Sequence, residues 1–270
     1  YGSGSGITNL PAIISGAFAN FGVLLTFYYM TLKRYSKLIL IGLLLSTASI
    51  LIAYITLGQR GLIMEILFSV IITYYALEKF LRPKAKTITK YVGILLIIAT
   101  TIPVIALTNS RFGNTVGGSQ SSLYFYTGQA NLFFNNHGLD NNGIRYGDRT
   151  FPLFKRMVGF NNVPNNFWER RQKYSNLDIN DSVFTSFVGD FALDYGPSIA
   201  LLMFIVFTLI VIKITRIRNQ ILKFHQLILL HYVMCVCFLG GLKSFVFSDV
   251  GGNLQIIIYF IMFLTFWYSY

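Results

Sequence analysis

Charged residues are scarce in this sequence. Asp, Glu, Lys and Arg make up only 12% of its 270 residues, about half of the roughly 25% that is usual in soluble domains. This shortage argues against a water-soluble enzyme, and the high apolar content argues against low-complexity disorder. Cysteine is nearly absent as well. The two cysteines, Cys235 and Cys237, lie in one apolar run and cannot form a disulfide framework or a four-ligand zinc site.

Acidic residues are fewer than basic ones. The 22 Lys and Arg residues against 10 Asp and Glu give a net charge of +12. An excess of this kind could indicate a nucleic-acid partner, but the cytoplasmic loops of membrane proteins also collect Lys and Arg. Because the chain is so apolar, the membrane explanation is favoured and no nucleic-acid partner is expected.

Long apolar runs dominate the chain, in which 54% of residues are hydrophobic. A spanning helix needs about 20 mostly apolar residues. Seven stretches qualify: residues 7–32, 38–57, 62–78, 91–108, 196–212, 226–247 and 252–270. The pattern predicts an all-α, polytopic helical bundle of about seven spans, because a lipid environment leaves open chains no other way to pair their backbone polar groups.

The basic residues are distributed unevenly between the short connections. Twelve of them fall in three alternate connections: Lys33, Arg34, Lys37, Lys79, Arg82, Lys84, Lys86, Lys90, Lys213, Arg216, Arg218 and Lys223. Cytoplasmic loops carry this excess, so we expect the N-terminus and residues 109–195 on the external face. The chain starts with neither Met nor a signal peptide. We therefore expect one membrane domain over residues 1–270, forming the C-terminal part of a longer protein.

The external segment, residues 109–195, is the candidate functional region. Loops longer than about 15 residues are uncommon unless they are functional or disordered, and this one has 87 residues with 17 aromatics and 13 Asn. Aromatic faces such as Tyr126 and Trp168, beside amide groups, suit the C–H patches and hydroxyls of sugar rings. A compact loop that packs its own aromatics and turns at Asn is the alternative interpretation.

Charged residues in and around this segment suggest a phosphate site. Arg145, Arg149 and Arg156 lie among Asp148, Asp181, Asp190 and Asp194; Arg binds two phosphate oxygens at once, and a carboxylate can act as a base toward a hydroxyl. Ordinary surface ion pairing remains the alternative. A further ring of charge is expected at the outer mouth of the bundle, where charges are costly and often functional: Arg60, Glu65, Arg111, Lys243 and Asp249.

Three stretches carry motifs in a characteristic order. The first is Gly58-Gln59-Arg60 at the start of a span. The second runs from Tyr126-Thr127-Gly128 through Tyr146-Gly147-Asp148-Arg149-Thr150-Phe151-Pro152 to Arg156. The third is Asp181-Ser182-Val183-Phe184-Thr185-Ser186-Phe187, followed by Asp194-Tyr195-Gly196. Over roughly residues 55–215 the chain resembles the oligosaccharide repeat-unit polymerases, the Wzy-type O-antigen and capsule polymerases of bacteria.

The resemblance is incomplete. In that family the last pattern typically reads Asn-x-Phe-Thr and then Asp-Phe-Gly, whereas here Asp181-Ser182 stands near the Asn and Tyr195 replaces the Phe. The Arg-x10-Gly pattern of some members does not follow Arg60, Arg111, Arg145, Arg149 or Arg156. No role is therefore carried over from that pattern.

The resemblance implies a membrane glycosyltransferase in the bacterial cytoplasmic membrane. It would transfer a glycan from undecaprenyl diphosphate to a hydroxyl of a second lipid-linked repeat unit, with membrane lipids and a chain-length regulator protein as further partners. Arginines would neutralise the diphosphate, and a loop Asp or His137 would accept the proton. The expected catalytic residues are Arg60, Arg111, Asp148, Asp181 and Asp194. The expected substrate-binding residues are Arg145, Arg149, Arg156, His137, Tyr126, Trp168 and Lys243.

No cofactor is expected. No metal is expected either, because no Asp-x-Asp pair occurs, although Asp178, Asn180 and Asp181 could hold a cation. Two other functions stay open. A sugar ligase of the O-antigen type would share this architecture, and His137-Gly138 would fit it. A lipid-linked oligosaccharide flippase or transporter would need ionisable residues inside spans, for which Glu65, His231 and Lys243 are candidates. The block from Asp181 to Gly196 favours the polymerase.

Overall fold

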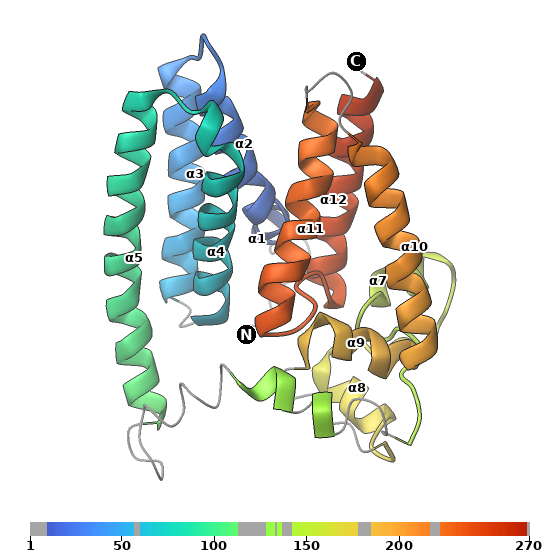
Figure 1. Cartoon of the computed structure of the whole chain (residues 1–270). Coiled ribbons are helices and arrows are strands. Elements are labelled where there is room, and N and C mark those ends of the chain that lie inside the picture. Colours follow the sequence, from blue (N-terminus) through green and yellow to red (C-terminus); the bar gives the residue numbers. More distant parts are fainter. Residues whose placement is uncertain are drawn as a thin grey trace. The chain divides into compact units, whose positions relative to one another are not determined.

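The computed structural model describes residues 10–56, 60–112, 128–132, 134–136, 142–177, 185–216 and 222–268. Apart from one isolated β-bridge between Ser186 and Ser244, regular structure in these residues is helical, which confirms the predicted all-α class. The named elements (Figure 1) are α1 (Leu10–Ala17), α2 (Ala19–Thr31), α3 (Lys37–Thr56), α4 (Arg60–Leu77), the 3-10 helix η1 (Glu78–Phe80), α5 (Pro83–Phe112), α7 (Pro152–Met157), α8 (Phe167–Lys173), α9 (Ser186–Tyr195), α10 (Pro197–Thr215), α11 (Phe224–Leu242) and α12 (Asp249–Tyr268).

Six helices in the described part of the chain are long and apolar enough to cross a membrane: Lys37–Thr56, Gly61–Phe80, Pro83–Ala106, Pro197–Thr215, Phe224–Leu242 and Asp249–Tyr268. They match six of the seven predicted stretches. The first stretch, 7–32, is described from residue 10 as two shorter helices, α1 and α2, which meet at Phe18. The predicted apolar helices of spanning length are therefore confirmed at six positions, as expected of a multi-pass membrane protein, and a seventh span remains a prediction.

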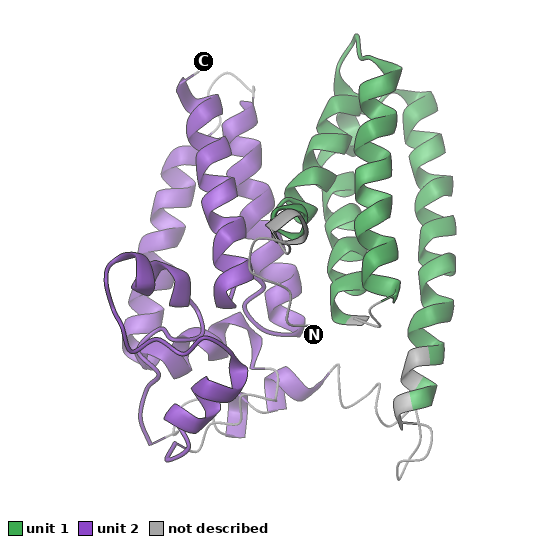
Figure 2. Ribbon diagram, turned by 180° about the vertical axis from the view of Figure 1, so that it is seen from behind, with its two compact units in different colours: residues 1–123 green, residues 124–270 purple. Residues whose placement is uncertain are grey.

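The chain divides into two compact units, Tyr1–Leu123 and Tyr124–Tyr270 (Figure 2). In the first unit α2 packs against α3 and α4, and α4 against α5. Arg82 at the start of α5 donates hydrogen bonds to the backbone oxygens of Leu32 (2.9 Å) and Lys33. The basic residues of the α2–α3 connection and those around the start of α5 therefore lie at one end of this unit. Arg60 begins α4 and Arg111 lies near the end of α5, so both backbones are at the other end.

In the second unit α11 is the central helix. It packs against α9, α10 and α12. In its apolar stretch of spanning length, 50% of the residues are buried, compared with 6% in the corresponding stretch of α10. The predominantly exposed apolar side chains of α10 are those expected to face lipid. Below these helices, three rings from separate segments pack edge to face: Phe151 lies 5.6 Å from Phe191 and 6.0 Å from Phe245, and Phe191 lies 5.1 Å from Phe245. This aromatic triangle holds the chain before α7 against α9 and the α11–α12 connection.

The start of α12 approaches the α11–α12 connection very closely. A Cβ atom added at Gly252 would lie 2.3 Å from the carbonyl carbon of Phe247, which is backbone and cannot rotate away. At the neighbouring Gly251, nothing lies within 4 Å of an added Cβ. A side chain at position 252 would therefore clash with the backbone, whereas a side chain at the adjacent position 251 would not.

We predict that Gly252→Ala destabilises the protein by about 1–3 kcal/mol, the usual cost of overpacking. Gly251→Ala is the matched control and should be neutral or stabilising by up to about 1 kcal/mol, because alanine favours helix. Thermal unfolding of both variants in the same detergent measures the difference. Equal melting temperatures would contradict the close approach.

Candidate functional site

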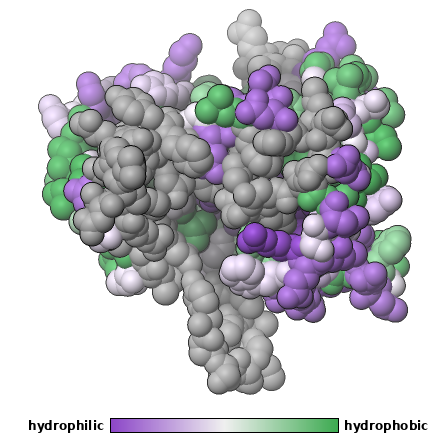
Figure 3. Space-filling view, turned by 90° about the horizontal axis from the view of Figure 1, so that it is seen from below, coloured by the Kyte–Doolittle hydropathy of each residue, from purple (hydrophilic) through white to green (hydrophobic). Residues whose placement is uncertain are grey.

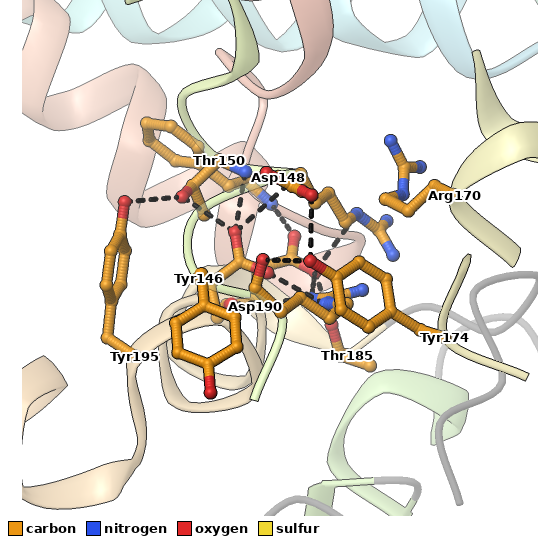
Figure 4. Close-up of polar contacts among 12 residues, drawn as sticks. Tyr146, Asp148, Thr150, Arg170, Tyr174, Thr185, Asp190 and Tyr195 are labelled. Carbon is orange, nitrogen blue, oxygen red and sulfur yellow. Dashed lines mark hydrogen bonds and ion pairs between the residues drawn. The ribbon is translucent and has the colours of Figure 1, made fainter. Parts of the chain in front are cut away.

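A tight turn at residues 145–148 arranges the first part of the site. Tyr146 and Gly147 both have positive φ, 55° and 79°, and the Asp148 N–H donates to the Arg145 carbonyl at 3.1 Å. This is the pattern of a type I′ turn, which favours glycine at its second central position. The side chains of Arg145 and Asp148 are fully buried, whereas Tyr146 is 66% exposed and its ring points away from the cluster (Figure 4).

Helix α9 supplies two buried carboxylates, Asp190 and Asp194. They are four residues apart and therefore lie on one face of the helix, and both are fully buried. Asp194 Oδ2 accepts hydrogen bonds from the Arg149 N–H (3.2 Å), the Thr150 N–H (2.7 Å) and the Thr150 hydroxyl (2.8 Å). One carboxylate oxygen thus fixes the chain that leaves the turn.

Two arginines of the turn region 145–150 compensate the charge of these carboxylates. Arg145 Nε lies 2.7 Å from Asp194 Oδ1, and Arg149 Nε lies 3.2 Å from Asp190 Oδ1. Arg145 Nη2 is also 3.8 Å from Asp190 Oδ1. Two cations and two anions are therefore interleaved in the interior, where desolvation would otherwise be very costly.

Asp190 connects this group to the α11–α12 connection. Its Oδ1 accepts from the Thr185 hydroxyl at 2.8 Å, and its Oδ2 accepts from the Phe245 N–H at 2.7 Å. The Ser186 N–H donates to the Lys243 carbonyl at 3.1 Å in the same region. The start of α9 and the residues between α11 and α12 are therefore held as one piece.

Asp148 is surrounded by three donors. Its carboxylate contacts Lys155 Nζ, Lys173 Nζ at 2.7 Å and the Tyr174 hydroxyl at 2.7 Å. Burial raises the pKa of Asp148, but the hydrogen bonds from Lys155, Lys173 and Tyr174 outweigh it, so the pKa lies below its ordinary value of 3.8. Burial and the same carboxylate raise the pKa of Tyr174. At neutral pH, Asp148 is therefore an anion and Tyr174 a neutral donor.

The N-terminal end of α12 completes the cluster. Arg170 Nη1 lies 2.6 Å from Asp249 Oδ1, and the Asp249 N–H donates to the Arg149 carbonyl at 2.9 Å. The fully buried Asn253 side chain donates to the Thr150 carbonyl (2.7 Å) and the Phe247 carbonyl (2.9 Å), and it accepts from the Leu153 N–H (3.0 Å). Asn253 therefore joins the helix directly to the polypeptide on both sides of Pro152.

The surface over this cluster is polar and basic. Of the seven Arg and Lys residues in 142–177, Arg145, Arg149 and Arg170 are buried. The other four, Lys155, Arg156, Arg171 and Lys173, are at least partly exposed, whereas Glu169 is the exposed acidic residue of this segment. Figure 3, which views the end of the molecule where α7, α8 and α9 lie, shows hydrophilic residues gathered on this face. Arg156 is half-buried and donates to the Pro164 carbonyl at 2.6 Å, and Trp168 is 67% exposed. Groups that suit phosphate and sugar are thus available at the surface.

The structure brings several of the predicted site residues into one network within the second unit. Arg145, Asp148, Arg149 and Asp194 belong to one contact network, which Lys243 adjoins through its backbone. Arg156 and Trp168 lie at the nearby surface. Arg60 and Arg111 lie in the other unit, and their side chains are outside the described residues. Tyr126, His137 and Asp181 are also outside the described residues.

Several members of the cluster were not among the predicted site residues. They are Thr150, Lys155, Lys173, Tyr174, Thr185, Asp190 and Asn253. The sequence could have indicated two of them. Asp190 precedes Asp194 by one helical turn, and Asn253 is a polar residue at the start of an apolar run. Among the described residues, no three His, Cys, Asp or Glu side chains come close enough to hold a metal ion.

Comparison with known proteins gives no relatives. No protein-family model matches the chain, and neither the curated proteins nor the solved structures contain a significant match.

We predict that Asp194→Asn destabilises the protein by about 3–5 kcal/mol, because it leaves Arg145 as a buried charge without its closest counter-ion. Glu169→Gln serves as the control, since Glu169 is exposed and its carboxylate accepts local hydrogen bonds from Asn165 and from Asn166, the N-cap of its helix. It should change stability by less than about 1 kcal/mol. Chemical unfolding of both variants in detergent provides the measurement, and similar losses would show that Asp194 does not hold the cluster.

We predict an acid-sensitive contribution from Asp148. Its folded pKa lies below 3.8, so its stabilising effect is complete above the unfolded pKa and is lost as pH falls through the folded pKa. Wild type should be more stable than Asp148→Asn at pH 7, and the difference should shrink below about pH 4. A difference that stayed constant down to acid pH would exclude this ionised role for the carboxylate.

Proposed function

We propose that this protein is a membrane glycosyltransferase that polymerises lipid-diphosphate-linked oligosaccharide repeat units. The observation that carries the proposal is the convergence of two motif blocks. Residues 145–150 and 194–196 are about 45 residues apart in the sequence, and Asp194 contacts Arg145, Arg149 and Thr150 directly. Both blocks adjoin the ends of candidate spanning helices, where a lipid-linked substrate would present its diphosphate.

In this proposal the buried pairs position the site and do not touch substrate. Arg145, Asp190 and Asp194 are fully buried and engaged by other protein groups. They fix the turn at 145–148 and thereby set where Tyr146 and the chain toward α7 emerge. A preorganised site of this kind avoids the cost of arranging its groups during the reaction.

The basic surface suits the leaving group. Lys155 and Lys173 lie at the rim of the cluster, each partly exposed, and Arg156 lies beside them on α7. In the proposed reaction, an acceptor hydroxyl oxygen bonds to the anomeric carbon of the donor sugar. The bond from that carbon to the diphosphate oxygen breaks, and its electron pair leaves with the diphosphate. Cations near the membrane surface stabilise that developing charge, a role that the resemblance also gives to Arg60 and Arg111.

The remaining roles are sugar binding and proton acceptance. Trp168 and Tyr146 offer exposed aromatic faces, which can stack on sugar rings. The proton of the attacking hydroxyl needs a base. Asp148 is a poor candidate because its pKa is low and three donors already engage it, so Asp181 and His137 are the preferred bases in this proposal.

The glycan length profile of cells that lack the gene tests the proposal. We expect the surface glycan ladder to collapse to single repeat units, because units would still be exported but not joined. A full ladder stranded on its lipid carrier would instead indicate a ligase, and single units retained on the cytoplasmic side would indicate a flippase. Either result would reject the polymerase.

A complementation series then tests Arg60. We predict that Arg60→Ala abolishes chain extension while leaving the protein inserted and expressed, because a cation would be lost where the diphosphate leaves. Arg34→Ala is the matched control, since Arg34 is exposed in the α2–α3 connection at the opposite end of the same unit. It should restore a normal ladder. Polymer of normal length from Arg60→Ala would remove Arg60 from the mechanism.

A further inference from the structure

The residues that end and follow α7 expose an unusual amount of apolar surface. Met157 is 67% exposed, Val158 77% and Phe160 59%, and Gly159 between them has a φ of 96°, which suits the sharp turn. We call Met157–Phe160 the α7 tip. It belongs to the basic segment 142–177, outside the candidate spanning helices. Large apolar side chains that are exposed there would normally contact water.

The α7 tip is held firmly to a candidate spanning helix. α7 packs against α12, and the Leu153 N–H in its first turn donates to Asn253 Oδ1 of α12 at 3.0 Å. In Figures 1 and 2, which share one vertical axis, α7 lies level with the first turns of α12. The end of a spanning helix marks the boundary between hydrocarbon and headgroups, so the tip stands at that depth.

The charges next to the tip have one sign. Lys155 and Arg156 precede it directly, and Lys155 Nζ lies 5.7 Å from the centre of the Phe160 ring. Lys155 also contacts an acidic side chain, Asp148, which Lys173 engages as well. Apolar residues beside basic ones such as Arg156, which donates to the Pro164 carbonyl, are the combination that binds the interface of an anionic bilayer.

We propose that the α7 tip is a membrane-interface anchor. Met157, Val158 and Phe160 insert at the boundary between headgroups and acyl chains of the bilayer that the protein spans, and Arg156 binds anionic lipid phosphates there. A protein partner is a poorer fit, because a stable interface usually buries more than about 1,000 Å² in total, whereas the tip offers four residues. The inference concerns lipid alone and does not depend on the glycosyltransferase activity.

Site-specific fluorescence tests the anchor in the full chain reconstituted in vesicles. Val158→Cys is made in a Cys237→Ser background, with buried Cys235 kept, and labelled with an environment-sensitive dye. Ser175→Cys, an exposed polar position after α8, is the matched control. Vesicles of phosphatidylcholine with and without phosphatidylglycerol are compared, and quenchers are attached to the lipid or dissolved in the water.

We expect blue-shifted emission at position 158, at least two-fold stronger quenching by the lipid-attached quencher than at position 175, and a deeper position with phosphatidylglycerol. Arg156→Gln should remove the phosphatidylglycerol effect without abolishing the insertion. Emission at 158 like that at 175, quenched from the water, would overturn the proposal. A blue shift without quenching from lipid would overturn it equally, since a protein surface would then cover the tip. No glycan substrate is present, so failure here is distinguishable from failure of the proposed function.

Discussion

Two carboxylates buried on one face of α9 determine how the polar end of the second unit is built. An aspartate without water must find charge and hydrogen bonds inside the protein. Asp190 and Asp194 obtain theirs from two arginines, two hydroxyls and three backbone N–H groups, which belong to the 145–150 turn, the start of α9 and the α11–α12 connection. Meeting the needs of two anions therefore fixes three chain segments relative to one another. The aromatic triangle of Phe151, Phe191 and Phe245 packs the same three segments together.

Much of the membrane architecture could be predicted from the sequence. Uninterrupted apolar stretches of spanning length have one structural solution in lipid, and six of the seven predicted stretches appear as helices of that kind. The division of the first stretch, 7–32, into α1 and α2 was not predicted, because its hydrophobicity does not show the interruption at Phe18. The positions of the basic connections within the first unit also agree with the alternation of its helices, since Arg82 contacts the α2–α3 connection.

The candidate site was only partly predictable. The Arg and Asp residues of the external segment were recognised, but a list of charges does not say which are buried, and Asp194 and Arg145 proved to be internal partners. Asn253 could not be anticipated as their neighbour, because its contacts with Thr150 and Leu153 join positions about 100 residues apart. Contacts of that range depend on packing that no local pattern records. The consequence for function is a division of labour, with buried pairs holding the site and exposed aromatic and basic residues available to a substrate.

The junction between α9 and α10 has a mechanical consequence. Asp194 lies two residues before Gly196, whose φ of 83° ends α9, and Pro197 starts α10 at once. No flexible linker separates the ion pairs from a candidate spanning helix. A helix that tilts to match the thickness of its bilayer would therefore act as a lever on Asp194. A change in bilayer thickness would therefore be transmitted from α10 to the buried ion pairs through Gly196.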